Sequence, residues 1–170
     1  MEIRKGKMSD AKGIAKVHVD SWRTTYVNIV PDEYLKEMTY ESREQLWNQL
    51  IPNGNVFVAE DNNGKIVGFA SGGRERSNQY EDFNGELYAI YLLEEYQRKG
   101  IGKLLFMQIV KYIQELGYNT MIVLVLAENP SCLFYEALGG RKIDALEVEI
   151  LGKKLVETVY GWEDIRRKMV

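Results

Sequence analysis

The stretch Tyr96-Gln97-Arg98-Lys99-Gly100-Ile101-Gly102-Lys103 decides how this chain folds. It follows residues 86–93, Glu-Leu-Tyr-Ala-Ile-Tyr-Leu-Leu, which are apolar on both faces after the first residue, as in a central strand covered on both sides. It leads into a helix expected from about residue 100 to 116. Two glycines one residue apart let the backbone approach a ligand closely, and the first N–H groups of a helix have no acceptor within it. With its three basic side chains, this turn predicts a pyrophosphate-binding loop.

Two common phosphate-binding motifs do not fit this loop. A P-loop requires Ser or Thr after Gly-Lys, but Leu104 follows Gly102 and Lys103, and no glycine stands at the required earlier spacing. A dinucleotide fingerprint requires a third small residue where this chain has Leu105. Both nucleotide-binding patterns therefore fail.

The segment from Gln97 to Gly102 instead resembles the Q/R-x-x-G-x-G/A loop of the GCN5-related N-acetyltransferase (GNAT) family. Residues 86–92 look like the fourth strand of that family, and residues 129–140 look like its fifth-strand-to-helix motif. The resemblance implies an α/β (α+β) fold with a mixed, mostly antiparallel central sheet flanked by helices. It also implies that the fourth and fifth strands splay apart beside the cofactor, in a single N-acetyltransferase domain of residues 1–170.

The remaining elements follow from hydrophobic periodicity and turn residues. Helices are expected after Ser9-Asp10, after Pro31 and Tyr40, and from Asn129-Pro130, where Asn129 would be the N-cap. Strands are expected at residues 2–5, 56–59, 66–70, 121–127, 141–146 and 155–162, with a hairpin turn at Asn62-Asn63-Gly64-Lys65.

The resemblance implies direct transfer of an acetyl group from acetyl-CoA to a primary amine of a small molecule or peptide N-terminus. The open edge of the fourth strand would pair with the pantetheine arm, and the N–H of Leu92 would polarise the thioester carbonyl. Tyr135 matches the family's helix tyrosine and is expected to be the general acid. The cofactor-binding residues so implied are Ile90, Tyr91, Leu92, Gln97, Arg98, Lys99, Gly100, Ile101, Gly102, Lys103, Asn129, Ser131 and Tyr135.

The sequence leaves two interpretations open for the general base and two for the acceptor pocket. Some members of the family carry a Glu on the fifth strand, but residues 123 and 124 are Val and Leu here. Glu86 is the substitute, either as a water-mediated base or as a solvated strand end. Trp22 and Tyr26 either wall the acceptor pocket or form an aromatic hinge, and Glu86 and Tyr88 are the other candidates for substrate contact. The loop of residues 74–84 carries charges of both signs, including Arg74 and Arg76, and is expected to be solvated rather than to select an acceptor.

The lone histidine and the lone cysteine restrict the chemistry further. One Cys excludes an internal disulfide, and one His excludes multi-histidine metal sites, so no metal is expected. His18 lies on the apolar face of the first helix, as a core residue or as an acceptor-site residue. Nothing near Cys132 supplies a base for a covalent mechanism, so packing is its expected role.

The charge balance and hydropathy restrict the partners. The 170 residues carry 22 Lys and Arg against 25 Asp and Glu, a net charge of −3, which argues against a nucleic-acid partner. The longest apolar run, residues 121–127, is far short of a membrane span, and no secretory signal is visible, so we expect a cytoplasmic protein without a membrane partner. The two C-terminal strands are candidates for a homodimer interface.

Two alternatives remain open at this level. One is a non-catalytic acyl-CoA sensor of the same fold, and the other is an acetyltransferase that acts on a macromolecule such as a protein N-terminus or a charged tRNA. Release of free CoA with a panel of amines distinguishes an enzyme from a sensor.

Overall fold

The computed structural model describes residues 1–167 and contains one seven-stranded sheet in the order β1-β2-β3-β4-β5-β7-β6. Neighbouring strands are antiparallel except for β4 and β5, which are parallel, so the predicted mixed, mostly antiparallel sheet is confirmed. The strands are β1 (Glu2–Lys5), β2 (Val56–Glu60), β3 (Ile66–Arg74), β4 (Gly85–Leu92), β5 (Met121–Leu126), β6 (Arg141–Ile150) and β7 (Lys153–Trp162).

The α-helices are α1 (Ala11–Thr25), α2 (Asp32–Glu37), α3 (Tyr40–Leu50), α4 (Ile101–Glu115) and α5 (Ser131–Ala137). Within residues 1–167, no helix combines the length and the apolar character that a membrane crossing requires.

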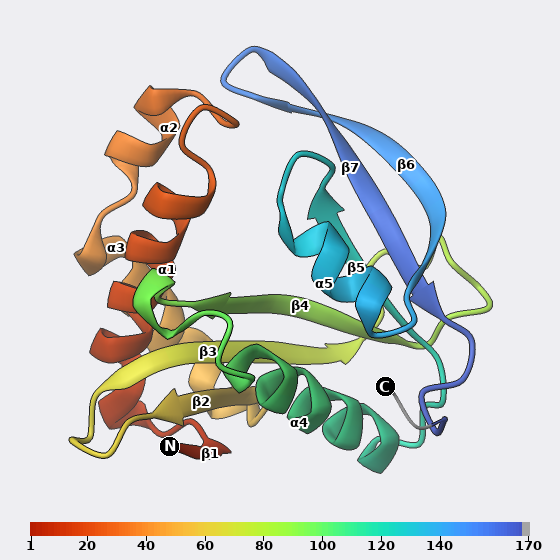
Figure 1. Cartoon of the computed structure of the whole chain (residues 1–170), viewed down its shortest axis with the longest axis horizontal. Coiled ribbons are helices and arrows are strands. Elements are labelled where there is room, and N and C mark those ends of the chain that lie inside the picture. Colours follow the sequence, from red (N-terminus) through yellow and green to blue (C-terminus); the bar gives the residue numbers. More distant parts are fainter. Residues whose placement is uncertain (168–170) are drawn as a thin grey trace.

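The helices cover both faces of the sheet, and β3 shows which helix covers which face. The ring of Phe69 lies 4.9 Å from that of Trp47 in α3 and 5.9 Å from that of His18 in α1. A Cβ at the neighbouring Gly68 would instead meet Leu105 of α4. Since successive residues of a strand point to opposite faces, α1 and α3 lie on one face and α4 lies on the other (Figure 1).

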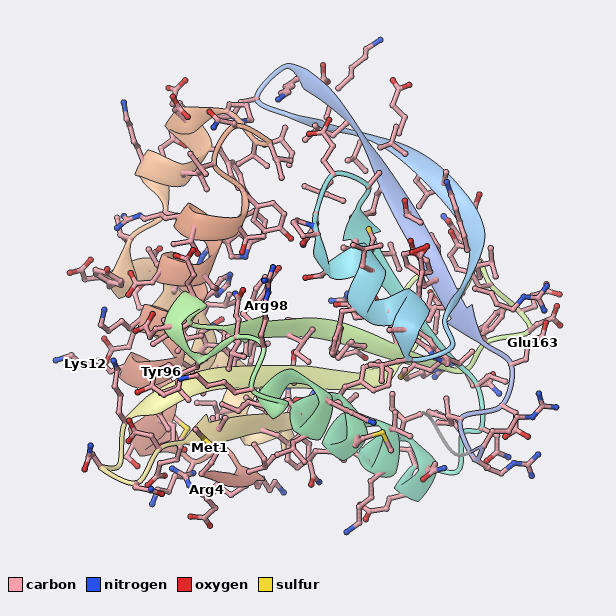
Figure 2. The ribbon with its side chains drawn as sticks, viewed as in Figure 1. Met1, Arg4, Lys12, Tyr96, Arg98 and Glu163 are labelled. Atoms are coloured by element: carbon pink, nitrogen blue, oxygen red, sulfur yellow. The ribbon has the colours of Figure 1, made fainter. Side chains whose placement is uncertain are left out.

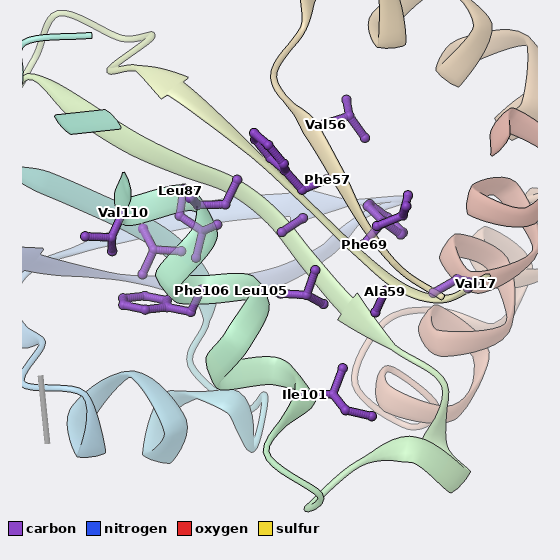
Figure 3. Packing of buried hydrophobic residues seen from close by; sticks show 14 of the residues in the cluster. Val17, Val56, Phe57, Ala59, Phe69, Leu87, Ile101, Leu105, Phe106 and Val110 are labelled. Atoms are coloured by element: carbon purple, nitrogen blue, oxygen red, sulfur yellow. The ribbon is translucent and has the colours of Figure 1, made fainter. Parts of the chain in front are cut away.

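The apolar stripe of α4 holds this helix against the centre of the sheet. Its buried side chains recur at the three- and four-residue spacing of one helix face and pack on β2, β3 and β4 (Figure 3). Ile101, in the first turn, is buried in the same cluster. The N-terminus of α4 is therefore fixed at the end of β4, where the predicted phosphate-binding loop precedes it.

Strands β4 and β5 part within the sheet. Their parallel pairing covers only residues 85–87 of β4 and 121–123 of β5, although both strands continue beyond it. From there β5 stays paired with β7 as far as Leu126, and β4 stays paired with β3 as far as Leu92. Figure 1 shows β5, β7 and β6 turning away from β4 at this point. The predicted splay is confirmed, and a bulge at Tyr88 accompanies it, because Ser71 pairs with Ala89 while Gly72 pairs with Leu87.

Two details differ from the prediction. Helix α5 begins at Ser131 with Pro130 in the cap position. Asn129, the predicted N-cap, therefore lies one residue before the observed cap, and its Oδ1 accepts a hydrogen bond from Ser131 N at 2.8 Å. Asp10 precedes α1 as expected, but its carboxylate accepts hydrogen bonds from Lys7 N and from the Arg4 guanidinium rather than from the first turn of α1.

Candidate active site

The loop between β4 and α4 leaves the first N–H groups of α4 without a backbone acceptor among residues 1–167. Gly100 is the N-cap of α4 with φ of +83°, and a Cβ there would meet nothing within 4 Å, so the backbone angle rather than crowding requires glycine. Leu104 N is the first amide of α4 to find an acceptor, the carbonyl of Gly100 at 3.3 Å. The N–H groups of residues 101–103 donate to no backbone carbonyl among the described residues and are therefore available to a ligand.

Three exposed cations surround this helix end: Arg98, Lys99 and Lys103. None of them forms an ion pair with any of residues 1–167. Figure 2 shows Tyr96 and Arg98 projecting from the loop between β4 and α4. Because the helix dipole adds positive potential at the same point, the arrangement favours a doubly charged ligand such as a diphosphate.

The edge of β4 that faces the splay carries backbone groups without a strand partner. Leu93 N donates to Val67 O of β3 at 2.9 Å, so its N–H points toward β3. Because backbone groups alternate between the two edges of a strand, the N–H groups of Ile90 and Leu92 point toward the splay. The side-chain amide of Gln97 donates from Nε2 to the carbonyl of Leu92 at 3.2 Å, so the Gln97 side chain turns back toward β4. This bond agrees with a Leu92 backbone that points toward the splay.

Tyr91 contributes a side chain rather than an amide to this region. By the same alternation its N–H points toward β3, and its ring stacks on that of His18 at 5.8 Å on the α1 face. Burial raises the pKa of the Tyr91 hydroxyl well above its ordinary value. Its phenol therefore belongs to the wall between α1 and β4.

Two other tyrosines meet where α1 approaches α5 across the splay. Tyr135 is 4% exposed, and burial, with Tyr26 and Cys132 close by, raises the pKa of its hydroxyl far above the ordinary value. The hydroxyl of Tyr26 accepts a hydrogen bond from Asn129 Nδ2 at 2.9 Å, which ties the end of α1 to the turn between β5 and α5. The structure thus places Tyr26, an acceptor-pocket candidate, beside Asn129 and Ser131 at the start of α5, the helix that carries Tyr135.

Trp22 and Tyr26 form an aromatic pair with ring centroids 4.2 Å apart. Tyr34 of α2 lies 5.9 Å and Tyr91 of β4 lies 6.1 Å from the Trp22 ring. The pair therefore both joins α1 to its neighbours and lines the α1 side of the splay.

Glu86 is buried rather than a solvated strand end. Its side chain is 3% exposed, with Oε1 accepting from Arg76 N at 3.1 Å and Oε2 accepting from the Arg76 guanidinium at 2.7 Å. The guanidinium also lies 4.0 Å from the ring centroid of Tyr88. The interpretation as an exposed strand end is therefore wrong, because the loop that precedes β4 folds back over its first residues.

That loop, residues 74–84, is ordered by a carboxylate that the sequence analysis overlooked. Glu75 is buried, and its oxygens accept hydrogen bonds from Ser77 N and Asn78 N, both at 2.7 Å. The predicted solvated loop is thus anchored at its start, and this positions Arg76 over Glu86. The sequence alone leaves Arg76 as one charged residue of a solvated loop, because nothing in its local pattern separates it from Arg74.

The lone histidine and the lone cysteine are packing residues. His18 Nδ1 accepts from Trp47 Nε1 at 3.1 Å, and burial, aided by the charge of Arg43, lowers the His18 pKa to about 4. Burial raises the pKa of the Cys132 thiol, which disfavours a nucleophilic thiolate. Residues 1–167 contain no group of three or more His, Cys, Asp or Glu side chains that could hold a metal ion.

The lowered pKa of His18 predicts an acid-sensitive core. Below the ordinary pKa of 6.5 the unfolded chain gains a proton that the folded chain does not take up until about pH 4, so the free energy of unfolding falls across that window. The loss is at most about 3 kcal/mol. Urea unfolding at several pH values should show this loss in the wild type and not in His18→Gln, whose amide oxygen can still accept from Trp47. Identical pH dependence in the two proteins would contradict the assignment.

Comparison with known proteins agrees with this geometry. The model of the Acetyltransferase (GNAT) family matches residues 18–140. The chain is 45% identical over 163 residues to the uncharacterized N-acetyltransferase YuaI of Bacillus subtilis (strain 168), covering 96% of this chain and 93% of that protein. It is 26% identical over 150 residues to the spermidine N(1)-acetyltransferase of Thermoplasma acidophilum, covering 85% of this chain and 89% of that protein.

A solved structure shares the fold. The chain superimposes with a TM-score of 0.73 on yncA from Salmonella typhimurium, a structure with its cofactor acetyl-CoA, over 100% of this chain and 96% of that one at 18% identity. The family match covers most of the described residues, including the splay and the loop before α4. The chain therefore belongs to the GNAT family of acetyltransferases and is an acetyl-CoA-dependent N-acetyltransferase.

Proposed function

We propose that residues 1–170 form a single domain that transfers the acetyl group of acetyl-CoA directly to a primary amine of a small molecule or a peptide N-terminus. The parting of β4 and β5 carries the proposal, because it frees the N–H groups of Ile90 and Leu92 beside the N-terminus of α4. A strand edge and a helix end, joined by one loop, suit a ligand that has amides at one end and phosphates at the other.

The residues of this region fit acetyl-CoA. The free edge of β4 at Ile90 and Leu92 would pair with the amides of the pantetheine arm. The N–H groups of residues 101–103, with Arg98, Lys99 and Lys103, would hold the diphosphate. When bound, acetyl-CoA supplies an activated acetyl group as a thioester. A donor such as Leu92 N–H at its carbonyl oxygen contributes roughly 3 kcal/mol by comparison with other oxyanion donors.

Two side chains, Glu86 and Tyr135, would transfer protons in this reaction. Glu86 would accept the proton of the acceptor ammonium through a water, because an alkylamine with a pKa near ~10.4 is mostly protonated at neutral pH. The freed amine would form the C–N bond as the C–S bond breaks, and Tyr135 would donate its proton to the departing sulfur. The nitrogen would then lose its extra proton, which through solvent restores the Tyr135 hydroxyl and leaves the neutral amide. Burial keeps the Tyr135 hydroxyl protonated at neutral pH, so a proton is present to be donated. The backbone N–H and the guanidinium of Arg76 hold the Glu86 carboxylate in place.

The acceptor class is tested by the release of CoA. The spermidine N(1)-acetyltransferase of Thermoplasma acidophilum makes a small amine the first class to assay, followed by peptides with a free N-terminus. We expect amine-dependent release of free thiol and a product that carries one acetyl group. Saturable binding of acetyl-CoA without thiol release above hydrolysis would overturn the catalytic assignment and indicate a sensor.

The basic side chains of the loop predict the affinity for acetyl-CoA. The triple variant Arg98→Gln/Lys99→Gln/Lys103→Gln should raise the Kd for acetyl-CoA by about 100-fold, because each charge-assisted contact to phosphate contributes roughly 1 kcal/mol at an exposed site. Isothermal titration measures this. Lys111→Gln, an exposed lysine two turns further along α4, is the matched control and should bind as the wild type does. Equal Kd values for the triple variant and the wild type would place the diphosphate elsewhere.

A further inference from the structure

Glu157 lies on β7 and faces the same side of the sheet as α1 and α2. It pairs directly across from Leu126 of β5, and directly paired residues share a face. Leu126 packs in a cluster with Tyr26, Val30 and Leu35, which belong to the end of α1 and the segment that follows it. The carboxylate of Glu157 therefore stands on the α1–α2 side, at the end of β5 that has parted from β4.

This carboxylate has no partner among residues 1–167. It accepts no hydrogen bond and forms no ion pair there, although its side chain is partly buried. Burial, and next the charge of Glu86, raise the pKa of Glu157, while Arg76 lowers it. Arg76, however, is already bonded to Glu86 at 2.7 Å. The Arg76 guanidinium is thus bonded to Glu86, and Glu157 is left without a cationic partner among residues 1–167.

A partly buried carboxylate without a partner costs free energy that a cationic ligand can recover. The surroundings of Glu157 suit an alkylammonium group. Tyr26, at the end of α1, packs in the same cluster as Leu126, the residue directly across from Glu157. Tyr80, in the loop before β4, donates to Asp144 Oδ2 at 2.9 Å on β6, the strand that pairs with β7 on its other side. Methylene groups of a ligand can pack on such rings while an ammonium group meets the carboxylate.

We propose that Glu157 binds a second ammonium group of the acceptor, so that the site selects diamines and polyamines over monoamines. The inference rests on the proposed function, in which Glu86 serves the amine that reacts. Glu157 then holds the distal amine and fixes the direction in which the acceptor enters. It is a specificity residue and takes no part in proton transfer.

The test compares two acceptors of equal chain length, the four-carbon diamine putrescine and the four-carbon monoamine butylamine. In Glu157→Gln, the KM for putrescine should rise about tenfold, since a hydrogen bond to a charged group contributes roughly 1.5 kcal/mol or more. The KM for butylamine, the KM for acetyl-CoA and kcat should change less than about twofold. Glu157→Asp keeps the charge and should retain part of the preference. Glu147→Gln, an exposed carboxylate on β6 that faces Lys154, is the matched control and should behave as the wild type.

The outcomes separate this inference from the proposed function. Equal losses for the two amines in Glu157→Gln, or a loss of kcat alone, would overturn the role of Glu157 and leave the acetyltransferase assignment standing. Equal KM values for putrescine and butylamine in the wild type would also overturn the role of Glu157 and leave the acetyltransferase assignment standing. Wild-type protein that binds acetyl-CoA but acetylates neither amine would overturn the inference together with the proposed transfer to small amines.

Discussion

Replacing Tyr135 by Phe lowers kcat by about 100-fold, while the KM for acetyl-CoA stays within about twofold of the wild-type value. The reason is that the substitution removes one proton donor and keeps the ring. That ring lies 5.4 Å from Phe134 and 6.1 Å from Tyr160, so its packing survives. Steady-state release of CoA thiol at saturating amine measures kcat directly.

Tyr160→Phe is the matched control for this prediction. Tyr160 is also a buried tyrosine, it packs on the same ring, and burial raises its pKa to about 12. It lies on β7, with no role in the proposed chemistry, so its variant should keep the wild-type kcat. Parallel losses of kcat and of acetyl-CoA affinity in Tyr135→Phe would indicate a binding or packing role instead. Unchanged kcat would remove Tyr135 from the mechanism.

Glu86→Gln gives the second large effect, a fall in kcat of about 100-fold near neutral pH. The amide keeps an oxygen that can accept from Arg76 N, so the fold of the loop is retained, but it cannot take a proton from the acceptor. The loss should diminish as pH rises toward about 10, where the amine is already deprotonated and needs no base. A pH–rate profile of the variant against the wild type measures this recovery.

A purely structural role for Glu86 makes a different prediction. In that case Arg76→Gln, which breaks the same ion pair from the other side, would lower kcat and thermal stability as much as Glu86→Gln does, and high pH would rescue neither. Arg74→Gln, an exposed arginine of the same loop, serves as the control and should leave kcat unchanged.

The sequence predicted the parts of this site that lie close together along the chain. The loop of residues 97–102, the covered strand before it and the helix after it are local features, and glycine spacing and apolar runs specify them. The splay followed from the family resemblance rather than from any pattern, because strand pairing between β4 and β5 depends on residues 36 positions apart.

The contacts that complete the site could not be predicted in this way. The hydrogen bond between Tyr26 and Asn129 joins residues 103 positions apart, and side chains of both types are common on surfaces. Arg76 meets Glu86 because Glu75 orders the intervening loop, which polar composition alone marks as solvated. Glu157 stands in a hairpin rich in charged residues, and only the register against Leu126 separates it from Glu147 and Glu149.

Chemical-shift changes of backbone amides during titration with acetyl-CoA show directly which backbone groups the cofactor contacts. We expect the largest changes on Ile90 and Leu92 of β4 and on residues 101–103 of α4, and we expect these changes to saturate together. Changes confined to another surface, such as the groove of about 660 Å³ that Lys12, Tyr40 and Lys65 help to line, would contradict the assignment of the splay as the acetyl-CoA site.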